Sequence, residues 1–225
     1  MIGIVIPSKR EANSFVNLIK NLSKETIFGF SFYNGIIEGI KCSLVICGIG
    51  KVNAAAATAY LISTKRPRYL FHFGSAGALS SDLLIGDLLL YTKVIEHDFY
   101  SSFSIPQVFP ELIVQGKLFD NFLEYVEEND ILIKKVKAAS GDEDVYSHKR
   151  KKELLITHQA DVVDWESFSF LHVCKISKMD CLIIRAVSDL SENNTKNEFF
   201  GNIDKSIGRI CEIFIKFLKK AIIVK

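Results

Sequence analysis

Two carboxylates flank the chain's only tryptophan in Asp164-Trp165-Glu166, which follows an apolar run. A carboxylate costs several kcal/mol to bury unless something pairs with it, so we expect Glu166 to point into a pocket and its partner to be a ligand. In the alternative interpretation, Asp164 caps the helix that follows and Glu166 is a first-turn acid favoured by the helix dipole. Considered alone, the segment leaves both interpretations open.

Further polar side chains stand at or just beyond the ends of other apolar segments. They are Glu11, Ser75, Arg185 and Asp189. Ligands of open α/β sheets bind at the carboxyl ends of the strands, so these positions indicate a ligand-binding edge. Arg185 stands within an apolar strand, where an arginine rarely occurs without a partner.

A metal site and a cofactor are not expected. His97-Asp98 would form a metal-binding or catalytic pair only with a third ligand in reach, and a satisfied structural pair is the favoured interpretation. The cysteines are odd in number and show neither a CxxC pair nor zinc-like spacing, which favours a reduced, cytoplasmic protein. They are Cys42, Cys47, Cys174, Cys181 and Cys211.

Length and composition predict one domain spanning residues 1–225. With 225 residues, of which 48% are apolar, the chain can bury a large core, and no Pro-, Ser- or Gly-rich linker divides it. Its 28 basic and 26 acidic residues give a formal charge of +2, and the basic run 149–152 lacks the aromatic residues of a nucleic-acid surface. No apolar run approaches the roughly 18 residues of a membrane span. Nucleic acid and membrane are therefore not expected as partners.

The first half of the chain predicts strands followed by helices. The apolar run 2–7 is typical of a strand buried on both faces, and apolar residues at helical spacing from Glu11 to Leu22 predict a helix. A meander of strands is expected over 28–33, 35–40 and 41–47. Asn34-Gly35, a strong hairpin signal, and Gly39 separate these strands. A glycine turn at 48–50 then leads into an alanine-rich helix.

The second half continues the alternation. Strands are expected over 68–73, 87–94, 131–139, 160–163 and 179–189, and helices over 114–127 and 203–223. Residues 74–78 are small and predict a second glycine turn, which would let backbone N–H groups and the Ser75 hydroxyl face a ligand. Residues 100–111 lack periodicity and predict a long loop, of the kind that often covers a site. The pattern as a whole predicts an α/β fold.

Five of these segments together resemble one family. They are residues 2–11, 47–55, 73–77, 163–166 and 185–189, in the family's order along the chain. The chain is similar in them to the bacterial nucleosidases that cleave 5'-methylthioadenosine and S-adenosylhomocysteine, within the purine and uridine phosphorylase superfamily. The resemblance implies a mixed, partly closed central β-sheet surrounded by helices. It also implies hydrolysis of the N-glycosidic bond of a 5'-modified purine nucleoside.

The resemblance also implies a role for each matching side chain. Glu11 would activate the attacking water, helped by Ser75 and Arg185, while Glu166 would accept the ribose hydroxyls and Asp189 would be the general acid at the purine. The remaining substrate-binding residues would be Asp164, Trp165, Gly77, Val145 and Phe199. These residue types suit the reaction, because positive charge builds on the ribose while the leaving base needs a proton.

Two positions depart from the family's pattern. Trp165 stands where the family has a methionine beneath the ribose, and a bulky indole should reshape the sugar or 5' pocket. Asp144 falls where the family has an aromatic residue that stacks on the purine, although Tyr146 could supply the ring after a small shift. Phe200 is as near as Phe199 to the family residue that lines the 5' pocket.

Other functions remain open beside hydrolysis of these substrates. The same scaffold serves phosphate-dependent purine nucleoside phosphorylases, but Glu11 would repel phosphate, so hydrolysis is favoured. Futalosine and other 5'-modified nucleosides are alternative substrates, and a non-catalytic nucleoside-binding protein is an alternative of another class. The resemblance implies a homodimer whose partner closes the 5' pocket, with the aromatic segment 99–103 as the local candidate for that contribution.

Overall fold

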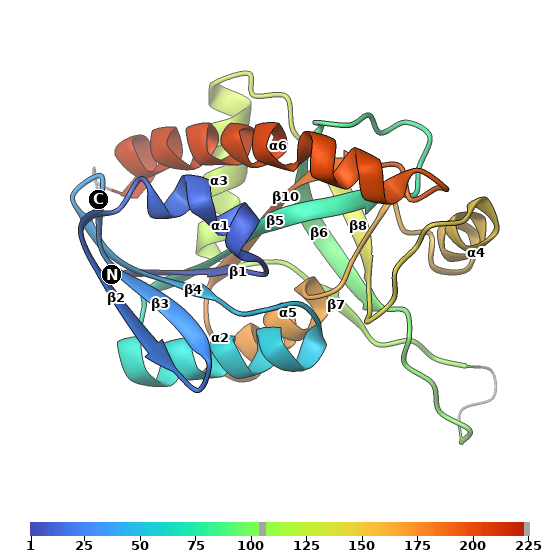
Figure 1. Cartoon of the computed structure of the whole chain (residues 1–225), viewed down its shortest axis with the longest axis horizontal. Helices are drawn as coiled ribbons and strands as arrows, with labels where there is room; N and C mark the ends of the chain where they lie inside the picture. The colour runs from blue at the N-terminus through green and yellow to red at the C-terminus, as the bar shows by residue number, and fades with distance from the viewer. Residues whose placement is uncertain (104–106, 223–225) are drawn as a thin grey trace.

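A computed structural model describes residues 1–103 and 107–222, and its centre is one mixed β-sheet (Figure 1). The strands are β1 (Ile2–Ile6), β2 (Lys20–Ile27), β3 (Phe30–Ile37), β4 (Ile40–Ile46), β5 (Tyr69–Ala78), β6 (Leu88–Glu96), β7 (Glu111–Ile113), β8 (Lys134–Ser140), β9 (Val162–Asp164) and β10 (Cys181–Asp189). The helices are α1 (Lys9–Val16), α2 (Lys51–Lys65), α3 (Lys117–Glu128), α4 (His148–His158), α5 (Ser167–Ile176) and α6 (Thr195–Phe217), and a π-helical turn, η1, follows at Leu218–Ile222.

Part of the sheet closes on itself. The strand order in the described ranges is β10-β6-β8-β9-β5-β1-β4-β3-β2, with β7 beside β6, and β10 also pairs with β5. The pairs β1–β4, β1–β5, β5–β10, β6–β8 and β8–β9 are parallel, whereas β2–β3, β3–β4, β5–β9, β6–β7 and β6–β10 are antiparallel. This arrangement confirms the predicted mixed, partly closed sheet.

Helices cover both faces of the sheet. In Figure 1, α1, α3 and α6 lie above the sheet, α2 and α5 lie below it, and α4 stands at its far end. The upper layer packs around Phe15, Phe73 and Phe214, and the lower layer around Leu61, Leu70 and Phe170. Every residue of β10 is buried, because this strand runs between the two layers. The two layers enclose β1, β5 and β10, and several of the polar side chains described below lie within these strands or just after them.

One of the two predicted turns of the meander is absent. Asn34-Gly35 lies inside β3, opposite Ser43 and Cys42, and the chain turns instead at Gly29, with φ of 82°. The turn predicted at Gly39 is present, with φ of 79°. Gly35 is needed for close packing: a Cβ there would stand 2.4 Å from Ile19 Cγ2 and 2.5 Å from Lys20 O. This contact comes from a neighbouring strand, so the dipeptide alone did not reveal it.

Several predicted boundaries were also wrong. Helix α1 ends at Val16, and Leu22 belongs to β2; helix α6 begins at Thr195 rather than at 203. Residues 74–78 form no turn, because β5 continues through them to Ala78, paired with β10 on one side and β9 on the other. The glycine turn at Gly48 and Gly50 is present, with φ of 87° and 96°.

The expected long loop lies partly outside the described residues, since 104–106 are not described. Its last residue, Glu111, belongs to β7, and no described residue of this segment lines the pocket below. The segment is therefore not a lid over the pocket of its own chain within the described part. Among the helices described, none is long and apolar enough to cross a membrane.

Candidate active site

One pocket of about 710 Å³ collects every site residue that the sequence singled out. These lining residues are Glu11, Ser75, Gly77, Val145, Asp164, Trp165, Glu166, Arg185, Asp189 and Phe199. They come from α1, β5, β9, β10, α6 and the turns after β8 and β9. The predicted ligand-binding edge is therefore a concave site, at which distant segments of the chain meet.

Glu11 is fixed at the pocket wall through both carboxylate oxygens. Its Oε2 accepts hydrogen bonds from Ser8 N at 3.1 Å and Ser8 Oγ at 2.6 Å. Its Oε1 accepts from Ser75 N and Ser75 Oγ, both at 2.9 Å. The Ser8 bonds form a capping box at the start of α1. The carboxylate is thus oriented by the helix start on one side and by β5 on the other.

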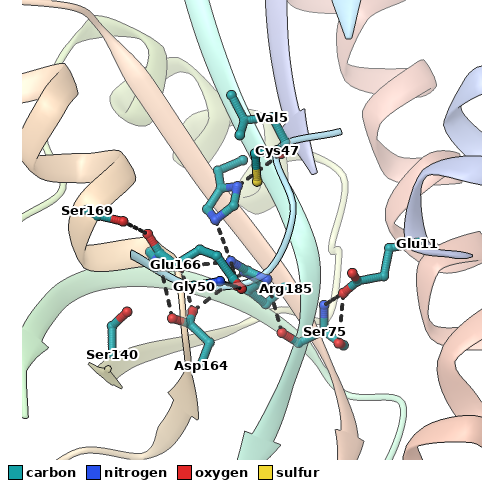
Figure 2. A network of polar contacts seen from close by, with 12 residues as sticks. Val5, Glu11, Cys47, Gly50, Ser75, Ser140, Asp164, Glu166, Ser169 and Arg185 are labelled. Atoms are coloured by element: carbon teal, nitrogen blue, oxygen red, sulfur yellow. Dashed lines mark hydrogen bonds and ion pairs between the residues drawn. The ribbon is translucent and has the colours of Figure 1, made fainter. Parts of the chain in front are cut away.

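Arg185 joins the two halves of the site and is 1% exposed. As Figure 2 shows, it lies between Ser75 on one side and the carboxylates of Asp164 and Glu166 on the other. Its Nη1 donates to Ser75 O at 3.2 Å, its Nε lies 3.6 Å from Asp164 Oδ2, and its Nη2 lies 3.5 Å from Glu166 Oε2. The buried guanidinium therefore stabilises both buried acids and the backbone beside Glu11.

His72 supports Arg185 from behind. His72 Nδ1 is 2.9 Å from Val5 O, so this nitrogen carries the proton and Nε2 is free to accept from Arg185 Nη2. Burial, together with the neighbouring Arg185 charge, lowers the pKa of His72 to about 3. The imidazole is therefore neutral at physiological pH and acts as an acceptor. No residue pattern in the sequence pointed to this contact.

The sequence predicted a ligand as the partner of Glu166, and the protein itself also supplies partners to this carboxyl group. Besides Arg185, Glu166 Oε1 accepts a hydrogen bond from Gly50 N at 3.0 Å, at the start of α2. Burial raises the pKa of Glu166 to about 8, although Arg185 opposes the shift. The partners come from residues far away in sequence, and the carboxylate still lines the pocket.

The capping alternative holds only in part, because the N-cap residue of α5 is Glu166, and Asp164, two residues before Glu166, binds the first N–H of the helix. Asp164 Oδ1 accepts from Ser167 N at 3.1 Å, the Ser167 hydroxyl bonds to its other oxygen, and Asp164 also pairs with Arg185. Glu166 makes no side-chain cap bond to α5. Asp164 therefore fastens the wall that carries Trp165 and Glu166.

Asp189 stands across the pocket at the end of β10. Its Oδ2 accepts from Ser188 Oγ at 2.8 Å and its Oδ1 from Ser191 N at 3.0 Å. Burial raises the pKa of Asp189 above its usual range, which favours the protonated form that a proton donor needs. Gly77 makes room for this group, because a Cβ there would lie 3.0 Å from Asp189 Oδ1 and 2.2 Å from Ser191 Oγ.

The two positions that depart from the family's pattern, Trp165 and Asp144, both line the pocket. Trp165 is half-buried, lines the pocket and belongs to none of the apolar core clusters of the described residues. Asp144 also lines the pocket and is exposed, as is Tyr146 beside it, while Val145 is buried. Phe199 and Phe200 both reach the pocket.

The pair His97-Asp98 has a structural environment. Asp98 forms an ion pair with Lys51, whereas His97 is buried and has no hydrogen-bond partner. Asp98 is thus satisfied as expected, and the ring of His97 is not. Within residues 1–103 and 107–222, no group of three or more His, Cys, Asp or Glu side chains is arranged to hold a metal ion.

Two residues of the site were missed in the sequence. Ser8 holds Glu11, and the spacing Ser8-x-x-Glu11 is the capping-box pattern that could have revealed it. His72 left no local signal, because a histidine in a buried strand takes its role from whatever the fold places beside it. The other lining residues of the outer pocket, among them Asn193 and Lys196, lie in a polar segment without a motif.

The chain combines a partly closed sheet with a pocket that has acids on opposite walls. Comparison with known proteins identifies the class of protein to which this combination belongs. The family model described as "Phosphorylase superfamily" matches residues 1–219. A 5'-methylthioadenosine/S-adenosylhomocysteine nucleosidase of Staphylococcus carnosus is 33% identical over 97% of this chain and 99% of its own. The chain therefore belongs to the phosphorylase superfamily and, within it, to the relatives of these nucleosidases, which confirms the resemblance.

Solved structures give the same result. A mutant of the Helicobacter pylori nucleosidase, with 5'-methylthioadenosine in its active site, matches with a TM-score of 0.85 and 25% identity over 98% of this chain and 97% of that one. Futalosine hydrolase of Helicobacter pylori strain 26695 matches with a TM-score of 0.87 and 26% identity over 98% of this chain and 96% of that one. The fold is thus common to enzymes named for different nucleosides.

Proposed function

We propose that this protein is a purine nucleosidase that hydrolyses the N-glycosidic bond of 5'-methylthioadenosine and S-adenosylhomocysteine. The observation that carries the proposal is the placement of Glu11, Glu166 and Asp189 around one pocket, each held by its own hydrogen bonds. The relatives named for this activity support the substrate class. No cofactor takes part in the proposed reaction.

The proposed reaction assigns one proton movement to each of two acids. Water attacks C1' of the ribose and loses a proton to Glu11, while the bond from C1' to N9 breaks and Asp189 delivers a proton to N7 of the leaving base. Glu166 binds the ribose hydroxyls, and its ionised form, which burial disfavours by raising its pKa to about 8, favours the cationic transition state. Arg185 acts at a distance by holding Glu166 and the backbone of Ser75 in place.

The hydrogen bonds around the pocket favour water over phosphate as the nucleophile. The N–H groups of Gly50 and Lys51 at the start of α2 already bind the carboxylates of Glu166 and Asp142. The N–H and hydroxyl of Ser75 bind Glu11. A phosphate would have to displace these carboxylates and approach their charges. These donors therefore do not offer the anion site that a phosphorylase needs.

The test is to incubate the purified protein with a panel of purine nucleosides, with and without phosphate, and to follow base release by chromatography. We expect adenine from 5'-methylthioadenosine and S-adenosylhomocysteine without phosphate. Release that requires phosphate would identify a phosphorylase, and release from futalosine alone would identify a futalosine hydrolase. A nucleoside that raises the melting temperature but is never consumed would identify a binding protein.

Replacing Trp165 by methionine is expected to widen the range of 5' substituents that the pocket accepts. The indole narrows the pocket that it lines, so the variant should improve kcat/KM for 5'-methylthioadenosine relative to a nucleoside with a smaller 5' group by roughly 10-fold. The measurement is kcat/KM for two nucleosides that differ only at the 5' position. An unchanged ratio together with a lowered melting temperature would assign Trp165 to packing alone.

A homodimer is the second part of the proposal. Phe103 is 99% exposed and Val52, near the pocket residue Ile49, is 79% exposed, although apolar rings and branched chains in water are unfavourable. A second copy that covers the segment 99–103 and the start of α2 would bury them and close the pocket. Sedimentation at micromolar concentration should give the mass of two chains, and a monomer would count against this arrangement.

The organisation of the chain and its compartment are inferred on similar grounds. We infer that residues 1–225 form one domain, since the strands of both halves of the chain enter one sheet. The five cysteines are free and buried, which fits a reducing compartment such as the cytoplasm.

A further inference from the structure

Helix α2 begins with two consecutive N–H groups whose acceptors come from other parts of the chain. Gly50, the N-cap residue, has no side chain that could cap the helix. Its N–H donates to Glu166 Oε1 at 3.0 Å, and the N–H of Lys51 donates to Asp142 Oδ1 at 2.8 Å. One helix start therefore binds both the ribose-side acid and the turn that follows β8.

The side chain of Lys51 closes a ring of contacts around the same turn. Its Nζ lies 2.7 Å from Asp98 Oδ1 and 2.8 Å from Glu96 Oε1, at the end of β6. The other oxygen of Asp98 accepts a hydrogen bond from Asp142 N at 2.9 Å. Asp142 is thus held through its backbone by Asp98 and through its carboxylate by Lys51, and Lys51 is held by Asp98.

The ring of contacts formed by Lys51, Asp98 and Asp142 supports one wall of the pocket. Residues 143–146 follow Asp142 directly and line the pocket, whereas Lys51, Asp98 and Asp142 do not. Gly141 lets the turn approach β6, because a Cβ there would stand 2.8 Å from Asp98 Cγ. The turn has other contacts as well: Gly141 N donates to Asp164 O at 3.0 Å, and both carboxylate oxygens of Glu143 accept hydrogen bonds from Arg150. Asp144 and Tyr146 are exposed, whereas Val145 is buried.

We propose that Lys51, Asp98 and Asp142 form a positioning network that fixes residues 143–146 relative to Glu166. The network does not touch the substrate and sets the distance between the wall at 143–146 and the ribose site. That this wall faces the base rests on the proposed function. The network itself rests only on the contacts around α2.

The first test is hydrogen exchange, which does not depend on the substrate. In Asp98→Ala, the amides of 141–147 should exchange ~10-fold faster than in the native protein, because their fastening is lost, while β5 and β10 stay protected. Lys51→Met should reproduce this pattern from the other side of the ring, and Lys51→Arg should restore it in part. Unchanged exchange at 141–147, or equal acceleration across the sheet, would overturn the proposal.

A matched control is Glu25→Gln. Glu25 forms an ion pair with Lys65 at the other end of α2. The two pairs are similarly exposed: the Glu25 side chain is 38% exposed and that of Asp98 25%, while Lys65 is 25% and Lys51 22% exposed. It also accepts a hydrogen bond from an asparagine side chain, as Asp98 accepts one from a backbone N–H. This variant should leave exchange at 141–147 unchanged. Acceleration there in Glu25→Gln would mean that the segment responds to any lost ion pair.

The second test separates binding of the two halves of the nucleoside. In Asp98→Ala and Lys51→Met, Kd for free adenine should rise ~10-fold, because the wall at 143–146 is displaced. Kd for 5-methylthioribose should stay unchanged, and KM for the whole nucleoside should rise with little change in kcat. Equal losses for base and sugar, or a loss in kcat alone, would contradict the positioning role. If the native protein released no base at all, the proposed function would fail while the exchange result still decided the network.

Discussion

Replacing Glu11 by glutamine should lower hydrolysis by roughly 10²-fold or more while a nucleoside still binds, because the variant removes the base and keeps the shape. The structure sharpens this expectation. One carboxylate oxygen accepts a hydrogen bond from Ser8 and the other accepts one from Ser75. An amide has only one oxygen, so glutamine can accept from only one of these two donors. The amide NH₂ must then face a donor, and the ring of bonds that orients Glu11 is broken as well.

The measurements for this variant are kcat, the Kd of a slowly hydrolysed nucleoside analogue and the melting temperature. Loss of the capping bonds to Ser8 should cost about 0.5–2 kcal/mol of stability, so folding must be checked before the rate is interpreted. A folded variant with nearly normal turnover would exclude Glu11 as the base. A variant that binds but does not turn over supports the role.

Replacing Asp189 by asparagine should have a large effect that depends on the leaving group. With purine nucleosides the loss should reach roughly 10²-fold or more, because the base departs without its proton. With a riboside whose leaving group departs without protonation, such as p-nitrophenol, the loss should be much smaller. Measuring kcat/KM for both substrate types decides the matter, and equal losses would remove Asp189 as the acid.

The pH dependence should carry the same signature. Burial raises the pKa of Asp189, and the protonated form is the active one in this role, so activity on purine nucleosides should fall as the pH rises through that raised pKa. The riboside of p-nitrophenol should lack this fall. A purine profile that stays flat as the pH rises would argue that the proton comes from another source.

Much of the site could be predicted, because Glu11, Glu166 and Asp189 can be recognised from the residues that directly precede them in the sequence. Each acid stands at or just after the end of an apolar segment. The parallel strands β1, β5 and β10 bring Glu11 and Asp189 to the same edge of the sheet. Glu166 follows β9, which is antiparallel to β5, so its place depends on the closure of the sheet. The residue type and its place in the pattern were therefore enough to select them. Their catalytic roles stay predictions until the variants are measured.

The contacts that hold these acids were not predictable in the same way. Gly50 bonds to Glu166 and Lys51 to Asp98 across long stretches of sequence, and no periodicity encodes which segments meet. The same reason explains the error at Asn34-Gly35. The dipeptide has the chemistry of a turn, but Gly35 is required by the neighbouring chain at Lys20 and lies within a strand.

The most direct test of the proposed chemistry is to let the purified protein act on 5'-methylthioadenosine in ¹⁸O-labelled water, without phosphate, and to analyse both products by mass spectrometry. We expect free adenine together with 5-methylthioribose that carries one ¹⁸O from the solvent. In Glu11→Gln, the rates of formation of both products should fall by the same factor. The proposed chemistry would be contradicted by a sugar without the label, by a sugar 1-phosphate that forms only when phosphate is added, or by a nucleoside that binds and is recovered intact.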